Sequence, residues 1–180
     1  MLFTQRETAT LAGIPFATLK TKINRSQLPT VIFDSENESY RFSAEAALMV
    51  AIQEALAREI GDADGLSPAT SSRIVEFNRE IIREVLWAPA SDKNRDRWLG
   101  YAGGVPSKPG EPPGGRNVSG TLKEVVKTLD RDEDGYARLF LVNVDAVLRD
   151  VEARARKHLK IDFGASARIE LMEETGNAGT

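Results

Sequence analysis

Residues 3–25 read FTQRETATLAGIPFATLKTKINR, and this stretch decides the fold of the N-terminal part of the chain. Thr4 and Glu7 have the spacing of a capping box, in which each side chain accepts a hydrogen bond from a free backbone N–H at a helix start. Gly13 tolerates a positive φ and so ends this first helix. Pro15 suits the first turn of a second helix. Two short helices joined by a tight, glycine-containing turn form a helix-turn-helix.

The second helix carries polar and basic residues opposite its apolar positions Phe16, Leu19 and Ile23, which are three and four residues apart. Between Glu7 and Asp34 the chain has no acidic residue, so the local charge is positive. Lysine and arginine neutralise phosphates, and asparagine, threonine and arginine can also read base edges in the major groove. The residues of this helix that we predict to face DNA are Thr18, Lys20, Thr21, Lys22, Asn24 and Arg25.

A β-hairpin is predicted after the second helix. Two runs of β-forming residues, 30–33 and 40–42, flank the polar stretch 34–39. A hairpin that follows a recognition helix is a wing. Ser43 then caps a third helix, which ends at Gly61. The predicted unit is a winged helix-turn-helix.

This region resembles the DNA-binding domain of the MerR superfamily, including its excisionase-like branch. The resemblance covers residues 3–57 and rests on Phe3-Thr4, Ala9 to Ile14, Thr18-Leu19, Tyr40 to Ser43, Ala47, Leu48, Ile52 and Leu56. In that family the second helix enters the major groove, and the wing touches the flanking backbone. The resemblance implies that Arg41 contacts a phosphate from the wing. It implies DNA contacts of the second helix by Thr18, Lys20, Thr21, Lys22 and Arg25.

The remainder of the chain predicts a mainly α fold with small β content. Ser67-Pro68 begins a further helix by cap and first-turn proline, and its wide apolar stripe favours either the core or a dimer contact. The predicted organisation has four parts. They are a winged helix-turn-helix at 1–60, a connecting or dimerisation helix at 67–88, an α+β oligomerisation or effector module at 92–165, and a flexible tail at 166–180.

Within the expected α+β module, short strands are predicted at 97–101 and 136–142. The stretch 103–120 is rich in glycine and proline, which is typical of a mobile loop. Thr121 and Glu124 repeat the capping-box spacing ahead of a short helix. A last helix with an apolar face follows the second strand.

Composition excludes several classes of protein. The chain has 180 residues, a net charge of −3, 41% hydrophobic residues and no cysteine. Any DNA contact must therefore come from a local patch, and no disulfide, zinc–thiolate site or thiol nucleophile is available. His158 is the only histidine, and no phosphate-binding loop is present. We expect no catalytic set, no metal site and no cofactor. No apolar run is long enough for a membrane span, and no signal peptide is recognisable, so we expect a cytoplasmic protein.

A second basic run extends from Arg154 to Lys160 near the end of the last helix. Arg154, Arg156, Lys157 and Lys160 could form another nucleic-acid patch. A charge run on a helix is usually its solvated face, and that is the favoured interpretation.

Three functions are open at this level. The first is a homodimeric, sequence-specific DNA-binding regulator, because dimers bind two half-sites and so reach useful specificity. The second is a recombination factor of the excisionase type, which bends DNA and recruits other proteins. The third is a protein-interaction module. It is motivated by the acidic wing tip at 34–38, which would repel phosphate and could bind a basic partner.

Overall fold

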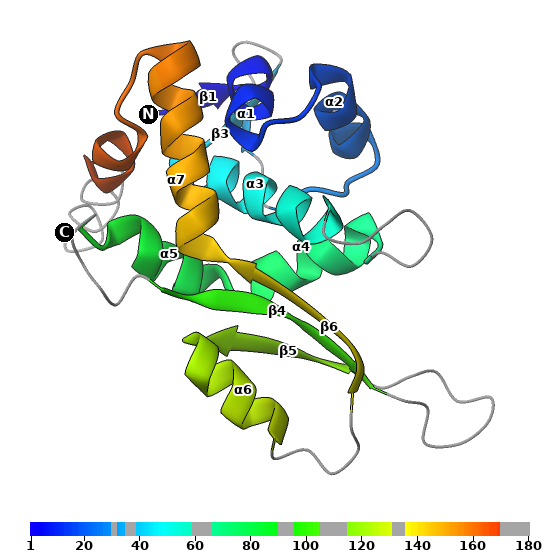
Figure 1. Cartoon of the computed structure of the whole chain (residues 1–180). Coiled ribbons are helices and arrows are strands. Elements are labelled where there is room, and N and C mark those ends of the chain that lie inside the picture. Colours follow the sequence, from blue (N-terminus) through cyan, green and yellow to red (C-terminus); the bar gives the residue numbers. More distant parts are fainter. Residues whose placement is uncertain are drawn as a thin grey trace, which may run out of the picture.

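The structure, a computed structural model, describes residues 1–29, 32–34, 39–58, 66–89, 96–104, 115–130 and 136–169. The fold is mainly α with two small antiparallel sheets, as predicted (Figure 1). Its elements in chain order are β1 (Phe3–Thr4), α1 (Gln5–Ala12), α2 (Phe16–Asn24), β2 (Ile32–Asp34), β3 (Ser39–Phe42), α3 (Ala44–Arg58), α4 (Pro68–Phe77), α5 (Arg79–Trp87), β4 (Trp98–Gly104), β5 (Gly115–Gly120), α6 (Leu122–Asp130), β6 (Tyr136–Asn143), α7 (Val144–Arg154) and the π-helical turn η2 (Ala155–Leu159). Residues 163–169 form a further helical segment.

Helix starts and stops follow local sequence signals. The Thr4–Glu7 capping box is formed, with the Thr4 N–H donating to Glu7 Oε2 at 2.7 Å and the Glu7 N–H donating to Thr4 Oγ1 at 3.2 Å. Gly13 ends α1 with φ +68°, a left-handed conformation that glycine adopts without steric cost. Ser43 and Ser67 accept backbone N–H bonds at the starts of α3 and α4. These four predicted boundaries are therefore confirmed, whereas the predicted end of the third helix at Gly61 lies outside the described residues.

The first sheet has the strand order β1-β3-β2, and both strand pairs are antiparallel. The β2–β3 hairpin is the predicted wing, and its tip, 35–38, lies outside the described residues. β1 was not predicted from the sequence, and it adds a third strand to the predicted wing. It consists of two residues, Phe3 and Thr4, which pair with Phe42 and Arg41. A strand of this length is too short to produce a recognisable alternation of apolar and polar residues.

One apolar core extends from Phe3 to Ala167 and joins both ends of the described chain. The rings of Phe3 and Phe163 stack with their centroids 5.7 Å apart. The long α3 supplies much of this core, and α1, α4, α5 and α7 pack around it (Figure 1). The predicted winged helix-turn-helix and the last helix are thus parts of one packed body.

The helix predicted at 67–88 is two helices, and the expectation of one continuous helix is wrong. Asn78 separates α4 from α5, and its side-chain Nδ2 donates to the Ile74 carbonyl oxygen at 2.8 Å. A side-chain amide that bonds to the preceding turn competes with the regular backbone ladder. Both helices bury apolar side chains in the core, but Phe77 is 73% exposed and Trp87 44% exposed.

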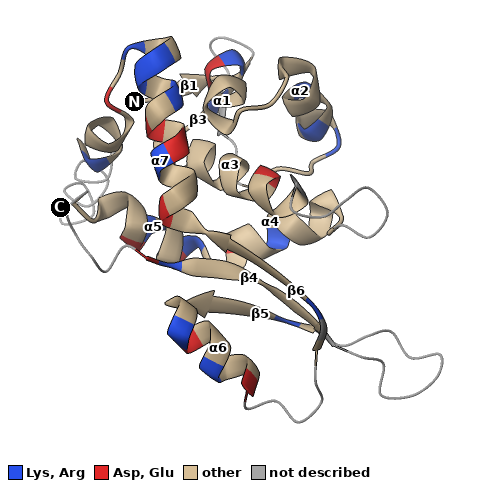
Figure 2. Cartoon of the chain, in the orientation of Figure 1, with Lys and Arg blue, Asp and Glu red and all other residues tan. Residues whose placement is uncertain are grey.

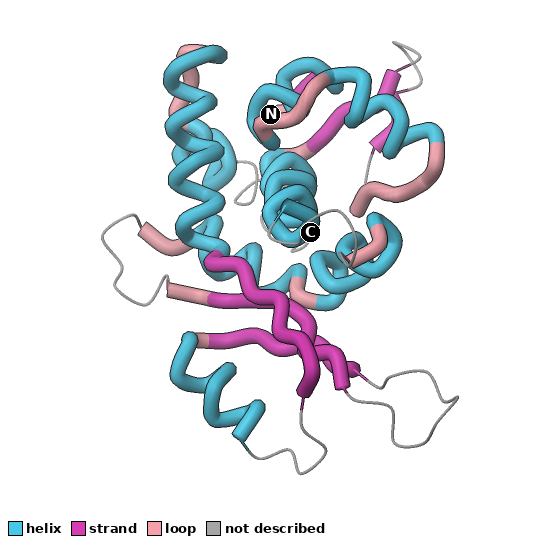
Figure 3. Tube along the Cα trace, turned by 45° about the vertical axis from the view of Figure 1, so that its right-hand side comes forward, coloured by secondary structure: helices cyan, strands magenta, loops and turns pink. Residues whose placement is uncertain are grey.

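The second sheet has the strand order β5-β4-β6 and lies beneath the helices, with α6 on its far side (Figure 3). β4 and β6 confirm the two predicted strands. The loop predicted at 103–120 is wrong at 103–104, which end β4, and over 115–120, which form β5, while 105–114 lie outside the described residues. β5 forms because β4 offers a hydrogen-bonding edge from Trp98 to Gly103, and nothing in the local composition reveals that edge.

The sheet packs on both faces. Leu99 and Val142 belong to the main core, whereas Ala102, Val118 and Val125 form a small separate cluster under α6. The segment predicted as one module at 92–165 is therefore divided between two packing environments.

The flexible tail predicted at 166–180 is wrong over residues 166–169. The helical segment at the C-terminal end continues to residue 169, and Ala167 within it is fully buried in the main core. A residue in the core cannot belong to a flexible tail. Residues 170–180 lie outside the described residues.

Candidate nucleic-acid interface

The helix-turn-helix is held together by a few buried apolar side chains. Leu11 on α1 and Leu19 and Ile23 on α2 are in the core beneath the turn. The turn itself is closed by Gly13, whose N–H donates to the Thr10 carbonyl oxygen at 3.1 Å. This packing fixes which side of α2 points outward.

The outward side of α2 is polar and basic. Lys20, Thr21, Asn24 and Arg25 are exposed, as predicted. The Thr21 hydroxyl donates to the Ala17 carbonyl oxygen at 3.0 Å, which orients that side chain along the helix. These are the residue types that contact phosphates and base edges in a major groove.

Two of the predicted residues do not belong to this exposed face. Thr18 is only half-exposed, because it lies at the border of the buried side of α2. The outward position predicted for Lys22 is wrong. Its side chain is buried, and its ammonium forms an ion pair with the Glu54 carboxylate on α3. A lysine held in this way contacts a carboxylate of its own chain and is not available to a phosphate.

Arg41 lies in the central strand of the first sheet. It pairs across the sheet with Thr4 on one side and with Ile32 on the other, and its side chain is half-buried. The hairpin therefore carries Arg41 at a position anchored by two strands, close to the start of α1. The acidic wing residues 35–38 lie outside the described residues.

A further cation lies close to α2. The guanidinium carbon of Arg6 on α1 lies 5.2 Å from the centroid of the Phe16 ring, and Phe16 is 38% exposed at the start of α2. Cation–π stacking of this kind holds an arginine in a defined orientation at the surface. Sequence reasoning did not select Arg6, although its place in the first turn of α1 made it a candidate for the exposed face.

The exposed surface formed by α1 and α2 carries positive charge, although the net charge of the whole chain is −3. Arg6, Lys20 and Arg25 are exposed, and none of them forms an ion pair with any residue that the structure describes. Glu7, the nearest acidic residue on α1, is engaged in the capping box. Cations that form no ion pair with a described carboxylate are available to an anionic ligand.

The described residues form neither a metal site nor a membrane-spanning helix. The described part of the chain contains no group of three or more histidine or acidic side chains placed to hold a metal ion. His158 is exposed on η2. None of the helices within these ranges has the length and apolar character needed to cross a bilayer.

No protein-family model matches the chain, and no curated protein matches its sequence.

Proposed function

We propose that this protein binds double-stranded DNA through α2 and acts as a sequence-specific transcriptional regulator of the MerR-like type, as a homodimer. The observation that carries the proposal is the exposed face of α2, where Lys20, Thr21, Asn24 and Arg25 project from a helix-turn-helix with a glycine turn. In this class of domain the second helix lies in the major groove. The wing, with Arg41, would contact the flanking phosphates.

Dimerisation is part of the proposal because a single small domain makes few base contacts. Two copies bind two half-sites spaced by about one helical turn of DNA, and this multiplies specificity. The exposed side chains of Phe77 and Trp87 support an intermolecular contact, since large apolar residues gain from burial.

The test is selection from a pool of random duplexes at two salt concentrations, followed by sequencing of the bound fraction. Enrichment of an inverted repeat supports the dimeric regulator. Several spaced direct repeats with marked bending would favour the excisionase-type recombination factor. The absence of any binding at low salt would overturn the proposal, and the protein-interaction function would then be the next to test.

Variants on α2 sharpen this test. Asn24→Ala should weaken binding to the selected site by about 1–3 kcal/mol and relax specificity if Asn24 reads a base. Lys20→Ala and Arg25→Ala should weaken binding to all sequences. For each phosphate contact that is lost, the slope of log affinity against log salt concentration should become less steep by about 0.9.

The control is Lys123→Ala/Lys127→Ala, which removes two exposed cations from α6 at the opposite end of the molecule (Figure 1). This variant should bind as the wild type does. If the α2 variants and the α6 control behave alike, the assignment of α2 as recognition helix is wrong.

A further inference from the structure

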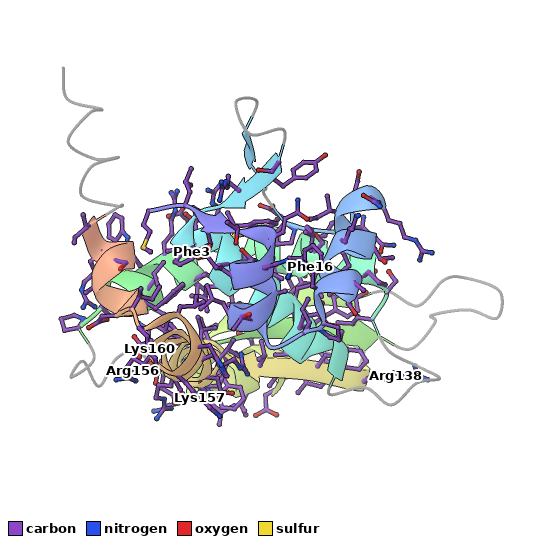
Figure 4. All side chains as sticks on the ribbon, turned by 90° about the horizontal axis from the view of Figure 1, so that it is seen from above. Phe3, Phe16, Arg138, Arg156, Lys157 and Lys160 are labelled. Atoms are coloured by element: carbon purple, nitrogen blue, oxygen red, sulfur yellow. The ribbon has the colours of Figure 1, made fainter. Side chains whose placement is uncertain are left out.

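Three exposed cations gather where α7 ends. Arg156 and Lys157 lie on η2, and Lys160 follows directly after it; together they are called the α7 basic patch. Figure 2 shows the basic end of α7 at the top of the molecule, and Figure 4 shows the three side chains close to one another. The Lys160 ammonium donates to the Lys157 carbonyl oxygen at 3.1 Å, which gathers the patch around the helix end.

The cations of this patch differ from those earlier on the same helix. Arg149 and Arg154 each have an aspartate four residues before them, and each forms an ion pair with it. Within the described ranges, no carboxylate forms an ion pair with Arg156, Lys157 or Lys160.

The two acidic residues nearest to the patch in the sequence, Glu152 and Asp162, form no ion pair with it. The Glu152 carboxylate, four residues before Arg156, lies against Gly164, and Asp162 accepts the Ala165 N–H at 3.0 Å at the start of the segment 163–169. Among the described residues, no carboxylate therefore neutralises the positive charge of the patch.

The backbone under the patch is unusual. The turn 155–159 is π-helical, a form found mostly as single turns and often at functional sites. Lys160 has φ +60°, in the left-handed region where glycine is the usual residue because a Cβ is crowded there. A lysine stands at this position despite its steric cost.

The patch is fixed relative to the helix-turn-helix. The Arg154 guanidinium, at the end of α7, donates from Nη1 to the Leu11 carbonyl oxygen of α1 at 2.8 Å. η2 also packs against α1, and α1 packs against α2 on its other side. In the view from above, the patch lies on one side of α1 and Phe16 of α2 on the other (Figure 4).

We infer that the α7 basic patch contacts the phosphate backbone of the same duplex that α2 binds, beyond the edge of the helix-turn-helix. This inference rests on the proposed function. The patch, α1 and α2 lie at the same end of the molecule (Figure 1), and lysine and arginine contacts to phosphate supply affinity without sequence preference. The patch would extend the footprint on one flank and fix the orientation of α2 in its groove.

The experiment compares two triple variants of the full chain with equal changes of charge. The patch variant is Arg156→Gln/Lys157→Gln/Lys160→Gln. The control variant is Lys123→Gln/Lys127→Gln/Arg149→Gln, whose exposed cations lie on α6 and earlier on α7. Thermal unfolding establishes that both variants fold, and affinity for the selected duplex is measured across a range of salt concentrations.

The patch variant should bind at least about tenfold more weakly near 0.1 M salt, and its salt dependence should flatten by about two to three units for each protomer bound, one phosphate contact accounting for roughly 0.9. The control variant should keep wild-type affinity and slope. Shortening one flank of the duplex should weaken wild-type binding and leave the patch variant unaffected, because that variant no longer holds the flanking phosphates.

The outcomes separate this inference from the proposed function. If the patch variant matches the control while Lys20→Ala and Arg25→Ala still weaken binding, the patch inference is wrong and the α2 assignment stands. If the patch variant loses affinity but the α2 variants do not, the patch binds DNA and the recognition helix is misassigned. If the wild type binds no duplex at any salt concentration, both are overturned.

Discussion

The guanidinium of Arg154 donates a hydrogen bond to the carbonyl oxygen of Leu11, across a separation of 143 residues. That carbonyl belongs to the last turn of α1, where helix carbonyls have no partner within the helix itself. The same guanidinium lies so close to Gly13 that a Cβ there would come within 2.9 Å of its central carbon. The end of α7 therefore caps the first helix and covers the turn of the helix-turn-helix.

Arg154→Ala should destabilise the protein by about 1.5–3 kcal/mol, the range for a hydrogen bond to a charged group whose removal leaves an acceptor unsatisfied. Urea unfolding at neutral pH measures the change. Arg149→Ala is the matched control on the same helix. Its ion pair with Asp145 is exposed and should contribute no more than about 0.5 kcal/mol. Equal destabilisation of the two variants would argue against a specific role for Arg154.

Lys22→Met should destabilise the fold by about 3 kcal/mol, because it leaves the Glu54 carboxylate buried without its partner. The double variant Lys22→Met/Glu54→Leu should recover most of that stability, since apolar residues can replace a buried ion pair at little net cost. Chemical denaturation of the two single variants and the double variant gives the coupling energy. A destabilisation below about 0.5 kcal/mol in Lys22→Met would mean that Lys22 is hydrated.

Gly100→Ala should disrupt the second sheet, because a Cβ on Gly100 would overlap the Phe140 carbonyl oxygen on β6. The expected cost is about 3 kcal/mol, the upper end for overpacking of a filled site. Gly103→Ala on the same strand is the control. There the nearest atom would be at an ordinary distance of 3.7 Å, the Cε1 of Tyr101. The melting temperature of Gly100→Ala should be well below that of Gly103→Ala. The reverse order would contradict the register of β4 and β6.

Glu124→Gln should reduce the stability of α6 at neutral pH and have no effect in strong acid. Hydrogen bonds from the Thr121 backbone N–H and hydroxyl hold the pKa of Glu124 below its ordinary value of 4.5. A carboxyl whose pKa is lowered by folding stabilises the fold above its unfolded pKa. That contribution disappears as the pH falls from 4.5 through the folded pKa.

Amide hydrogen exchange of α6 in the two proteins, compared above and below this range, checks the prediction. The difference between wild type and Glu124→Gln should shrink as the pH falls. A difference that stays constant with pH would mean that the charge of Glu124 plays no part in the cap.

Much of the fold was predictable because its signals are local. Capping residues such as Thr4, Ser43 and Asn143 act within three residues along the chain, so their spacing is visible in the sequence. β5 was not predicted, because this glycine-flanked segment becomes a strand only when β4 provides a partner. The break at Asn78 was missed because its residues also suit a continuous helix.

The candidate site also has a part that the sequence predicts and a part that depends on the folded structure. Helical spacing alone indicated which residues of α2 are polar, and Lys20, Thr21, Asn24 and Arg25 are indeed exposed. The burial of Lys22 depends on Glu54 of α3, which docks against α2 only in the folded chain.

The helix-turn-helix, the hairpin after it and the polar, basic face of α2 follow from residues close together in the chain, because backbone conformation and capping depend on near neighbours. The folded structure was needed to show that the end of α7 packs on α1 and that Arg154 bonds Leu11. It was also needed to place Arg156, Lys157 and Lys160 beside the helix-turn-helix (Figure 4). Such contacts join distant segments, and they form when apolar surfaces exclude water and bring those segments together.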